Sequence, residues 1–302
     1  MKTEEFLAEL NYLFCKTANR MPVIVEPQKI VHPQGEGDEE VAVLVIGDLQ
    51  IGHKTPTTTM RIIANRMQRL TAKFIKIVRH HRKMYPVKRL EIFLLGDLIQ
   101  SEDIGFKVGL DELEDVLMGQ MFKGAIPILE QMLVDLSPHF DQIDVRTVSG
   151  NHGRLDRFHA DTTNWDTIIY KILETRTGDF VNWHIEGHKF WQKVKIWRKT
   201  FLVVHGDQIR MWMNIPWYGI TQRLMRWQGS LPGDKFHYMV MGHFHVISNF
   251  VWNDVQVFVN GCFVSDDQWV LKQIGMQSST SQWAFGVHPR QGVTWRYQIG
   301  LD

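Results

Sequence analysis

Apolar runs of strand length recur through the first half of this chain, and a longer segment with helical spacing follows each of them. The runs that predict strands are VAVLVIGD at 41–48, RLEIFLLGD at 89–97 and IDVRTVSGNHG at 143–153. The segments that predict helices are 57–83, 109–136 and 164–178. From about residue 180 onward the pattern consists mainly of short strands, predicted at VNWHI (181–185), KFWQKVKIW (189–197), TFLVVHGD (200–207), YMVMGHFHV (238–246), FVWNDVQVFVN (250–260) and GVTWRYQI (292–299). An order of βαβα followed by a β-rich half predicts an α/β fold.

The two ends of the chain and one internal segment differ from this central pattern. Residues 4–16 carry an apolar stripe that predicts a helix, either packed on the core or used as an oligomer contact. We therefore predict that residues 1–32 form a helix and an arm packed on the core. Residues 33–302 are predicted to form one domain, with an aromatic and basic insert at about 207–237. The piece after residue 265 either closes the fold or contributes to a homodimer surface.

Composition limits the classes of protein to which this chain can belong. Of its 302 residues, 44% are hydrophobic and 22% are charged, which is typical of a soluble globular protein. The net charge of +1 gives no overall field toward nucleic acid or membrane, so any basic surface must be local. The early acids of MKTEEFLAEL argue against a secretory signal, and no window approaches the ~20 apolar residues of a membrane span. Cys15 and Cys262 form no disulfide framework, so we expect free thiols and a cytoplasmic protein.

Five of the apolar strands end in polar clusters, which carry the candidate chemistry. The side chains at these ends are Asp48, Asp97, Asn151 with His152, His205 with Asp207, and His243 with His245. Ligands of α/β sheets bind beyond the carboxyl ends of the strands, so neighbouring strands would bring these residues into one cleft. Glycine precedes the polar residue in four of the five clusters and permits a tight turn there. Carboxylate, amide and imidazole donors together suit divalent metals of intermediate hardness.

The ordered set of motifs resembles that of the calcineurin-like metallophosphoesterases, over about residues 41–262. The matching segments are DLQ at 48–50, GD at 96–97, GNH at 150–152, VHGD at 204–207 and GHFH at 242–245. The resemblance implies a four-layer α/β/β/α sandwich of two mixed sheets flanked by helices. It also implies two metal ions that share Asp97. The other ligands that it implies are Asp48 and His245 for the first ion, and Asn151, His205 and His243 for the second.

Gln50 departs from this pattern, because the family usually has a histidine at that position. An amide oxygen binds Mn²⁺ or Mg²⁺, but it is a weaker and harder donor than imidazole. Three interpretations are open. Gln50 binds the first metal directly or through water, His53 replaces the missing imidazole, or the first site is so weak that the protein uses one metal or none. We favour ligation by Gln50 and place His53 on the substrate side of the site.

The resemblance and the donor chemistry together predict hydrolysis of a phosphoester. Bound cations, with Mn²⁺ favoured over Mg²⁺, Fe²⁺ or Zn²⁺, polarise phosphate and lower the pKa of a bound water. His152 would bind no metal; it is the predicted acid for the leaving oxygen, because imidazole titrates near neutral pH. Arg154 and Arg157 either clamp phosphate oxygens or form surface salt bridges. Asp207 either orients the imidazole of His205 or is an ordinary turn carboxylate.

The insert suggests which phosphoester is the substrate. It interleaves tryptophan and arginine, and we predict that Arg210, Trp212 and Trp217 bind substrate. Aromatic faces beside guanidinium groups suit single-stranded or frayed nucleic acid, whereas a small helix packed as a lid is the structural alternative. The favoured prediction is a DNA nuclease similar to the repair-exonuclease branch of the family. A phosphomonoesterase, a small-nucleotide phosphodiesterase and an inactive binding scaffold remain as alternatives.

Overall fold

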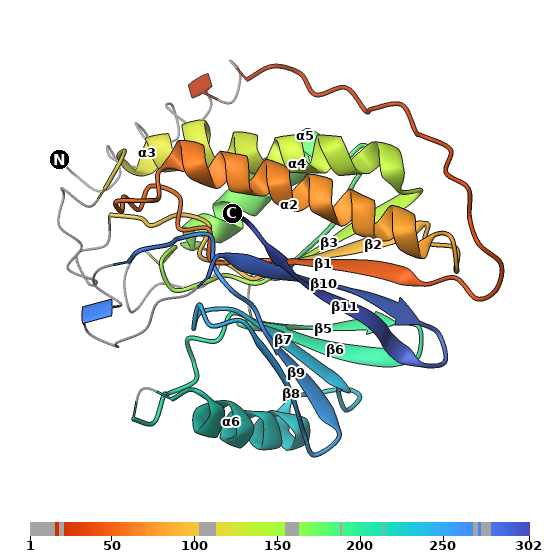
Figure 1. Cartoon of the computed structure of the whole chain (residues 1–302). Helices are drawn as coiled ribbons and strands as arrows, with labels where there is room; N and C mark the ends of the chain where they lie inside the picture. Colours follow the sequence, from red (N-terminus) through yellow and green to blue (C-terminus); the bar gives the residue numbers. More distant parts are fainter. Residues whose placement is uncertain are drawn as a thin grey trace.

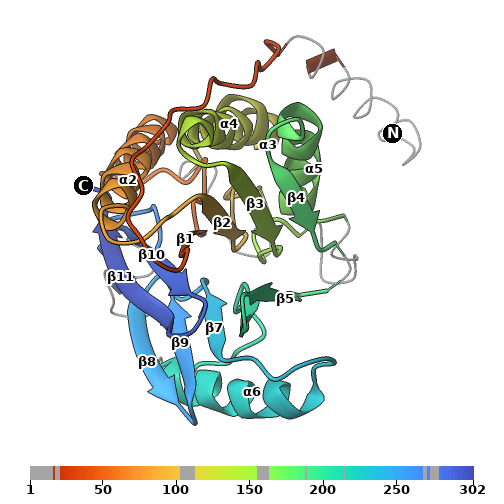
Figure 2. The same ribbon diagram turned by 90° about the vertical axis from the view of Figure 1, so that its right-hand side faces the viewer.

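Two mixed β-sheets lie face to face, and helices cover the outer face of each sheet (Figures 1 and 2). The computed structural model describes residues 16–17, 21–102, 113–154, 163–187, 189–213, 215–267, 271–272 and 279–302. This α/β/β/α order of layers confirms the predicted fold class. All but the last position of the helix predicted at 4–16 lies outside the described residues.

The first sheet has six strands in the order β11-β10-β1-β2-β3-β4. Its parallel strands are β1 (Val41–Ile46), β2 (Arg89–Leu94), β3 (Gln142–Thr147) and β4 (Asn182–Ile185). The antiparallel strands are β10 (Ser281–His288), which pairs with β1, and β11 (Gly292–Gly300) at the edge. The three strands predicted in the first half of the chain are therefore neighbours, and their C-terminal ends share one edge of the sheet.

The second sheet has five strands in the order β5-β6-β7-β9-β8. Its strands are β5 (Trp191–Ile196), β6 (Lys199–Val204), β7 (Tyr238–Met241), β8 (Ser248–Trp252) and β9 (Val255–Val259). β6 and β7 are parallel neighbours, as are β7 and β9. The C-terminal ends of β6 and β7, which carry two of the histidine motifs, therefore lie side by side.

Helices from the first half of the chain cover the first sheet, and one later helix covers the second (Figure 2). The covering helices are α2 (Met60–His81), α4 (Ile126–Leu136) and α5 (Trp165–Thr177) on the first sheet, and α6 (Trp217–Ser230) on the second. A short α3 (Leu117–Gly119) and a π-helical stretch (Gln120–Ala125) precede α4. Helix α2 begins at Met60, later than the predicted start at residue 57. The Thr59 hydroxyl caps it there by accepting the N–H of Ile62 at 3.3 Å.

The continuous apolar sequence of β1 follows from its position between two cores. Ala42, Leu44 and Ile46 face the core under the helices of the first layer. Val41, Val43 and Val45 face the core between the two sheets. A strand that is buried on both faces cannot alternate polar with apolar residues, so its run reads as uniformly hydrophobic. A third core lies between the second sheet and α6.

Strand β10 was absent from the predicted elements, although all eight of its residues are buried. Polar residues such as Gln282 flank its short apolar stretch WAFGV at 283–287, and the glycine within that stretch weakens the strand pattern. The Gln282 amide oxygen accepts the N–H of Gly47 at 3.0 Å and the side-chain amide of Asn260 at 2.6 Å, which satisfies this buried group. The C-terminal piece therefore completes the first sheet beside β1.

The described part of the N-terminal arm lies along the helical layer. The N–H of Ile30 donates to the carbonyl of Pro138 at 2.7 Å, and the Lys29 ammonium donates to the carbonyls of Ser137 and Phe140. Within the described ranges, no helix has both the length and the apolar character needed to cross a bilayer.

Candidate metal centre

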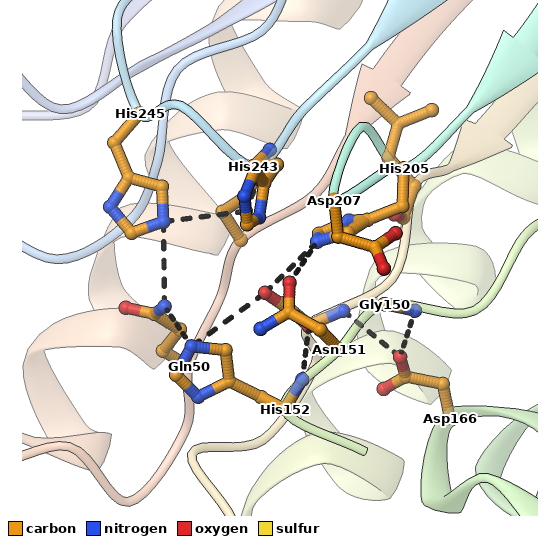
Figure 3. Close-up of polar contacts among 12 residues, drawn as sticks. Gln50, Gly150, Asn151, His152, Asp166, His205, Asp207, His243 and His245 are labelled. Atoms are coloured by element: carbon orange, nitrogen blue, oxygen red, sulfur yellow. Dashed lines mark hydrogen bonds and ion pairs between the residues drawn. The ribbon is translucent and has the colours of Figure 1, made fainter. Parts of the chain in front are cut away.

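The seven predicted metal ligands gather where the carboxyl ends of strands from both sheets meet (Figure 3). They are Asp48 and Gln50 after β1, Asp97 after β2, Asn151 after β3, His205 after β6, and His243 and His245 after β7. The carboxylate of Asp48 accepts the backbone N–H of His243 at 3.1 Å on each oxygen, although 195 positions separate the two residues. Loops of the two sheets are thus joined directly at the site.

Asp97, Asn151, His205 and His243 form the tighter of two groups. The Nε2 atom of His205 lies 3.1 Å from Oδ2 of Asp97 and 3.0 Å from Oδ1 of Asn151. The rings of His205 and His243 have their centroids 5.1 Å apart. One donor atom from each of Asp97, His205 and His243 lies within 4.8 Å of the other two. A single cation can contact donors at this spacing.

The orientation of the His205 ring is fixed by the backbone. Its Nδ1 atom lies 2.7 Å from the carbonyl of Leu95, which can only accept, so Nδ1 carries a hydrogen and Nε2 faces the other donors. Burial acts to lower the pKa of His205, but the Asp97 carboxylate outweighs burial and raises this pKa to about 10. Burial also acts to raise the pKa of Asp97, and the charges of His205 and His152 outweigh it and lower that pKa. The Asp97 carboxylate is therefore stable here only beside positive charge.

His243 has the opposite electrostatic character. Burial and the neighbouring charge of His205 lower the pKa of His243 to about 3. Its imidazole is therefore neutral at physiological pH. Neutral imidazole is the form of histidine that binds metal ions.

Asp48, Gln50, His152 and His245 form the second group. The Nε2 atom of His245 lies 3.3 Å from Oδ1 of Asp48. The amide nitrogen of Gln50 lies 3.4 Å from Nε2 of His245 and 3.3 Å from Nε2 of His152, so the amide lies between the two rings (Figure 3). His152 in turn lies 3.8 Å from the Asp97 carboxylate, which connects the two groups.

Five of the seven predicted ligands have left-handed backbone conformations. Their φ angles are 53° at Asp48, 45° at Gln50, 51° at Asp97, 70° at His243 and 58° at His245. A residue other than glycine pays roughly 1–3 kcal/mol for such a conformation, which persists only where its surroundings enforce it. Strain of this kind concentrates at functional sites, so its presence at five ligand positions is evidence for a site that does not depend on the motif match.

Two of the glycines in the motifs are required by the close approach of carboxylates. A Cβ atom on Gly150 would lie 2.1 Å from Oδ1 of Asp97, and one on Gly242 would lie 2.3 Å from Oδ2 of Asp48. Neither carboxylate can move away, because each is buried among the other donors. These glycines therefore allow the loops to close around the acids.

The chemistry of the gathered donors fits divalent cations. Asp48 and Asp97 are 0% and 1% exposed, and among the described residues neither forms an ion pair with a lysine or an arginine. Buried carboxylates require a cationic partner. The Oε1 atom of Gln50 is also buried, without a hydrogen-bond partner in the described part of the chain. Buried anions beside imidazoles are a donor set that Mn²⁺, Fe²⁺ or Zn²⁺ accepts. A half-turn of the Gln50 amide, whose nitrogen faces the two rings here, would add its oxygen to this set.

Asp166, which sequence reasoning did not identify, organises two of the ligand loops. Its Oδ2 atom accepts the N–H groups of Asp97 at 3.0 Å and Gly150 at 2.8 Å, and its Oδ1 atom accepts the N–H of Leu98 at 3.0 Å. Burial and the Asp97 charge raise the pKa of Asp166 to about 6. The only signal in the sequence was its place in the first turn of α5, two residues after the Asn164 cap, where an acid is usually interpreted as a helix-start residue.

Replacing Asp166 with alanine is expected to weaken both the fold and the metal site. Each of three buried N–H groups would lose its acceptor at a cost of about 1–3 kcal/mol, so the free energy of unfolding should fall by at least ~3 kcal/mol. Misplacing the two loops should weaken Mn²⁺ binding roughly 10- to 100-fold. Urea denaturation and calorimetric Mn²⁺ titration measure the two effects. Asp166→Asn, which keeps one acceptor oxygen, should lie between alanine and wild type. Unchanged Mn²⁺ affinity in the alanine variant would limit Asp166 to a role in folding.

Asp207 does not orient His205, contrary to the first of its two predicted roles. The Leu95 carbonyl holds that ring, while the Asp207 carboxylate accepts from the Arg154 guanidinium and from the Gln208 amide. Arg154 is thus held beside the metal ligands rather than released to the surface. The two motifs GNHGR and VHGD are connected through this ion pair.

The remaining predicted substrate residues lie outside the ligand cluster. His53 is buried, and its Nδ1 atom lies 3.9 Å from a carboxylate oxygen of Asp267. Burial, followed by the charges of His152 and His245, lowers the pKa of His53, and Asp267 only partly offsets this. His53 therefore lies near the second group, and its backbone N–H donates to the carbonyl of Gln50 at 2.9 Å. Arg157 lies outside the described residues.

The aromatic and basic insert does not enter the metal cluster. Its helix α6 buries Ile220, Leu224 and Trp227 against the second sheet and so forms the fourth layer rather than a lid. Arg210 and Trp212 are exposed, and the Trp217 ring meets Phe250 edge to face with centroids 5.5 Å apart.

No protein-family model and no curated protein matches this chain. Similar solved structures include a zinc complex of Vps29 from Entamoeba histolytica, at 12% identity and a TM-score of 0.38, covering 86% of this chain and 99% of that chain. An archaeal phosphodiesterase matches at 11% identity and a TM-score of 0.39, over 86% of this chain and 99% of that one. YfcE, a phosphoesterase from E. coli, matches at 13% identity and a TM-score of 0.38, over 86% of this chain and 100% of that chain. Structural similarity at this level of identity assigns no activity to this chain.

Proposed function

We propose that this chain is a divalent-metal-dependent phosphodiester hydrolase that cleaves DNA, similar to the repair exonucleases of the metallophosphoesterase family. The observation that carries the proposal is the convergence of two buried carboxylates, two amides and three histidines from five strand ends on one edge of the sandwich. Left-handed backbone at five of these positions supports the same conclusion.

The two groups of donors suit two cations. Asp48, Gln50 and His245 would hold one ion and Asn151, His205 and His243 the other, with Asp97 between them. Bound cations would neutralise charge on the phosphate and supply hydroxide near neutral pH. Mn²⁺ is the favoured ion, because the set combines hard oxygen donors with imidazole.

His152 is the group that we assign to the leaving oxygen. Its Nδ1 atom lies 3.3 Å from the carbonyl of Gln100, so Nδ1 carries a hydrogen and Nε2 faces the site. The N–H of its backbone donates to Oδ1 of Asp97 at 2.8 Å, which ties the ring to the ligand cluster. The imidazolium form of this ring, with hydrogens on both nitrogens, would donate its Nε2 proton to an oxygen that leaves phosphorus.

Arg154 is the group that we assign to the phosphate oxygens. The ion pair with Asp207 orders the guanidinium beside the ligand loops while its side chain stays 39% exposed. A guanidinium that retains solvent-facing N–H groups can bind a second partner. Asp207 is thus a positioning residue for Arg154.

The preference for DNA rests on the insert. The segment 208–233 contains Arg210, Arg223 and Arg226 and no acidic residue. Exposed aromatic rings of Trp212, Trp217 and Tyr218 accompany these cations. Stacking faces beside cationic groups are what bases and phosphates of a single strand bind.

Comparing four substrates tests the proposal. The protein with Mn²⁺ is incubated with a phosphodiester reporter, a phosphomonoester reporter, and single- and double-stranded DNA. We expect cleavage of the diester and of DNA, and loss of both with a chelator. Hydrolysis of the monoester alone would assign a phosphatase instead. No turnover with Mn²⁺, Mg²⁺, Fe²⁺ or Zn²⁺ would leave a binding scaffold, the function that Gln50 favours.

Changing Gln50 to histidine is expected to strengthen Mn²⁺ binding about tenfold, equivalent to ~1.4 kcal/mol, because imidazole is the stronger donor. The opposite change, Gln50→Ala, should weaken Mn²⁺ binding. Calorimetric titration of Mn²⁺ into each metal-free protein measures both. Equal affinities in all three proteins would show that Gln50 is not a ligand.

A further inference from the structure

Many of the exposed large apolar side chains lie within residues 211–225, a segment beside the metal centre. Large apolar residues that are exposed in and around this segment are Met211, Trp212, Met213, Ile215, Trp217, Tyr218 and Met225. Solvent-facing apolar groups gathered in this way mark a binding surface. The segment leaves the second sheet just after His205 and Asp207, and Figure 1 shows it at the start of α6, at the end of the molecule where the ligand loops lie.

The most exposed of these residues sit on a tight turn. Trp212 and Ile215 exchange two backbone hydrogen bonds, of 3.1 and 2.9 Å, and so close the turn. Trp212, Met213 and Ile215 are 66%, 82% and 53% exposed, and we call these three side chains the apolar tip. Met213 has a left-handed φ of 50°, which keeps the turn compact. A closed turn holds such side chains outward with little freedom to fold back.

Arginines flank the apolar tip on both sides in the sequence. Arg210 precedes it, and Arg223 and Arg226 follow it on α6. None of the three forms an ion pair with any residue in the described ranges. Exposed Met, Ile and aromatic side chains in a segment whose charged residues are all arginines match a nucleic acid, in which apolar groups wedge between bases while cations bind the phosphates.

We propose that the apolar tip is a wedge that opens the end of a DNA duplex and directs one strand toward the metal centre, an inference that rests on DNA as the proposed substrate. Insertion of the tip would unstack the terminal base pair, and the exposed rings of Trp212 and Tyr218, whose centroids are 6.4 Å apart, would stack on the freed bases. The freed strand would then be directed toward the ligand cluster.

The proposal is tested with the variant Met213→Ser, Ile215→Ser in the full chain, called the tip variant, which keeps the Trp212 ring in place. A matched control is Val251→Ser, Trp252→Ser, because these residues are also exposed at a hairpin but lie at the β8–β9 turn, at the opposite end of the second sheet. Melting temperatures establish that both variants are folded. Met213→Ser alone, at the most exposed position, provides a milder variant.

The first measurement is duplex opening without cleavage. A blunt DNA duplex with a fluorescent base analogue in its terminal pair is mixed with each protein in excess chelator. Wild type and control should raise the fluorescence of the analogue, and the tip variant should not. The second measurement is cleavage with Mn²⁺. The tip variant should cleave blunt duplex about tenfold more slowly or worse, since unstacking costs a few kcal/mol per step, and should cleave a forked duplex as wild type does.

The outcomes separate this inference from the proposed function. If wild type opens the duplex end, the tip variant does not, and neither cleaves DNA, the wedge proposal is supported and the nuclease proposal is overturned. Cleavage of blunt and forked duplexes that is equal in the tip variant and wild type would overturn the wedge and keep the nuclease. Sedimentation tests the remaining outcome. If wild type is a dimer, the tip variant is a monomer and both open DNA equally, the surface serves self-association and the wedge is overturned. Neither opening nor cleavage by wild type would overturn both.

Discussion

The substitution Asp97→Asn is expected to slow hydrolysis of phosphodiesters by at least ~10³-fold. The metal pair would supply several kcal/mol of charge stabilisation in the transition state, and each ~1.4 kcal/mol corresponds to a tenfold change in rate. Asp97 is 1% exposed, and its carboxylate lies beside the rings of both His205 and His152, so it touches both groups of donors. The amide keeps the shape of the side chain but removes its charge. Both cations should therefore bind more weakly.

Metal content and rate should be measured together for Asp97→Asn. We expect fewer Mn²⁺ ions per chain after equilibrium dialysis and a rate near that of the chelated wild type. Asp141→Asn, which removes an exposed carboxylate just before β3, serves as the control and should behave like wild type. Full metal content together with full activity in Asp97→Asn would remove Asp97 from the site and with it the shared-ligand arrangement.

Replacing His152 with alanine is expected to slow hydrolysis by about 10²–10⁴-fold on substrates whose leaving oxygen needs a proton, which is the usual contribution of a general acid. A nitrophenolate leaves without protonation, so a nitrophenyl diester should lose far less. Because His152 is not assigned as a ligand, the number of Mn²⁺ ions per chain should not change. This combination of effects separates a proton donor from a ligand.

The comparison for His152→Ala uses DNA and the nitrophenyl diester in parallel, with metal content measured on the same samples. His184→Ala is a suitable control, since His184 lies on β4 and pairs with Asp144 at 2.8 Å, with no contact to the described ligands. An equal loss on both substrates, accompanied by loss of metal, would instead make His152 a ligand.

The strands that carry the site could be predicted from the sequence because each is marked by a hydrophobic run within its own segment. A run such as VAVLVI can be buried on both faces, and the residues after it must turn. The identities of Asp48, Asp97 and His205 at such turns already limit the chemistry to metal binding or acid–base work. Strand β10 escaped prediction because Gly286 interrupts its short apolar stretch, and because its buried Gln282 is satisfied by Gly47 and Asn260, which are distant in sequence.

Roles that depend on partners distant in sequence could not be predicted in the same way. Asp166 resembled a helix-start residue, and only the packing of α5 beneath two loops made it their common acceptor. Asp207 was read with its neighbour His205, whereas its partner is Arg154, 53 positions away. An amide such as Gln50 gives no sign in sequence that its oxygen is left unpaired.

The sequence by itself determined which donor types stand at the ends of the strands, because strand burial and turn formation are local consequences of residue order. Only the tertiary structure decided that β1, β2 and β3 lie in one sheet and β6 and β7 in another whose carboxyl ends meet the first. That meeting depends on packing two apolar faces together, which no single segment encodes. It is also what holds five side chains on left-handed backbone, since isolated loops would relax from that conformation.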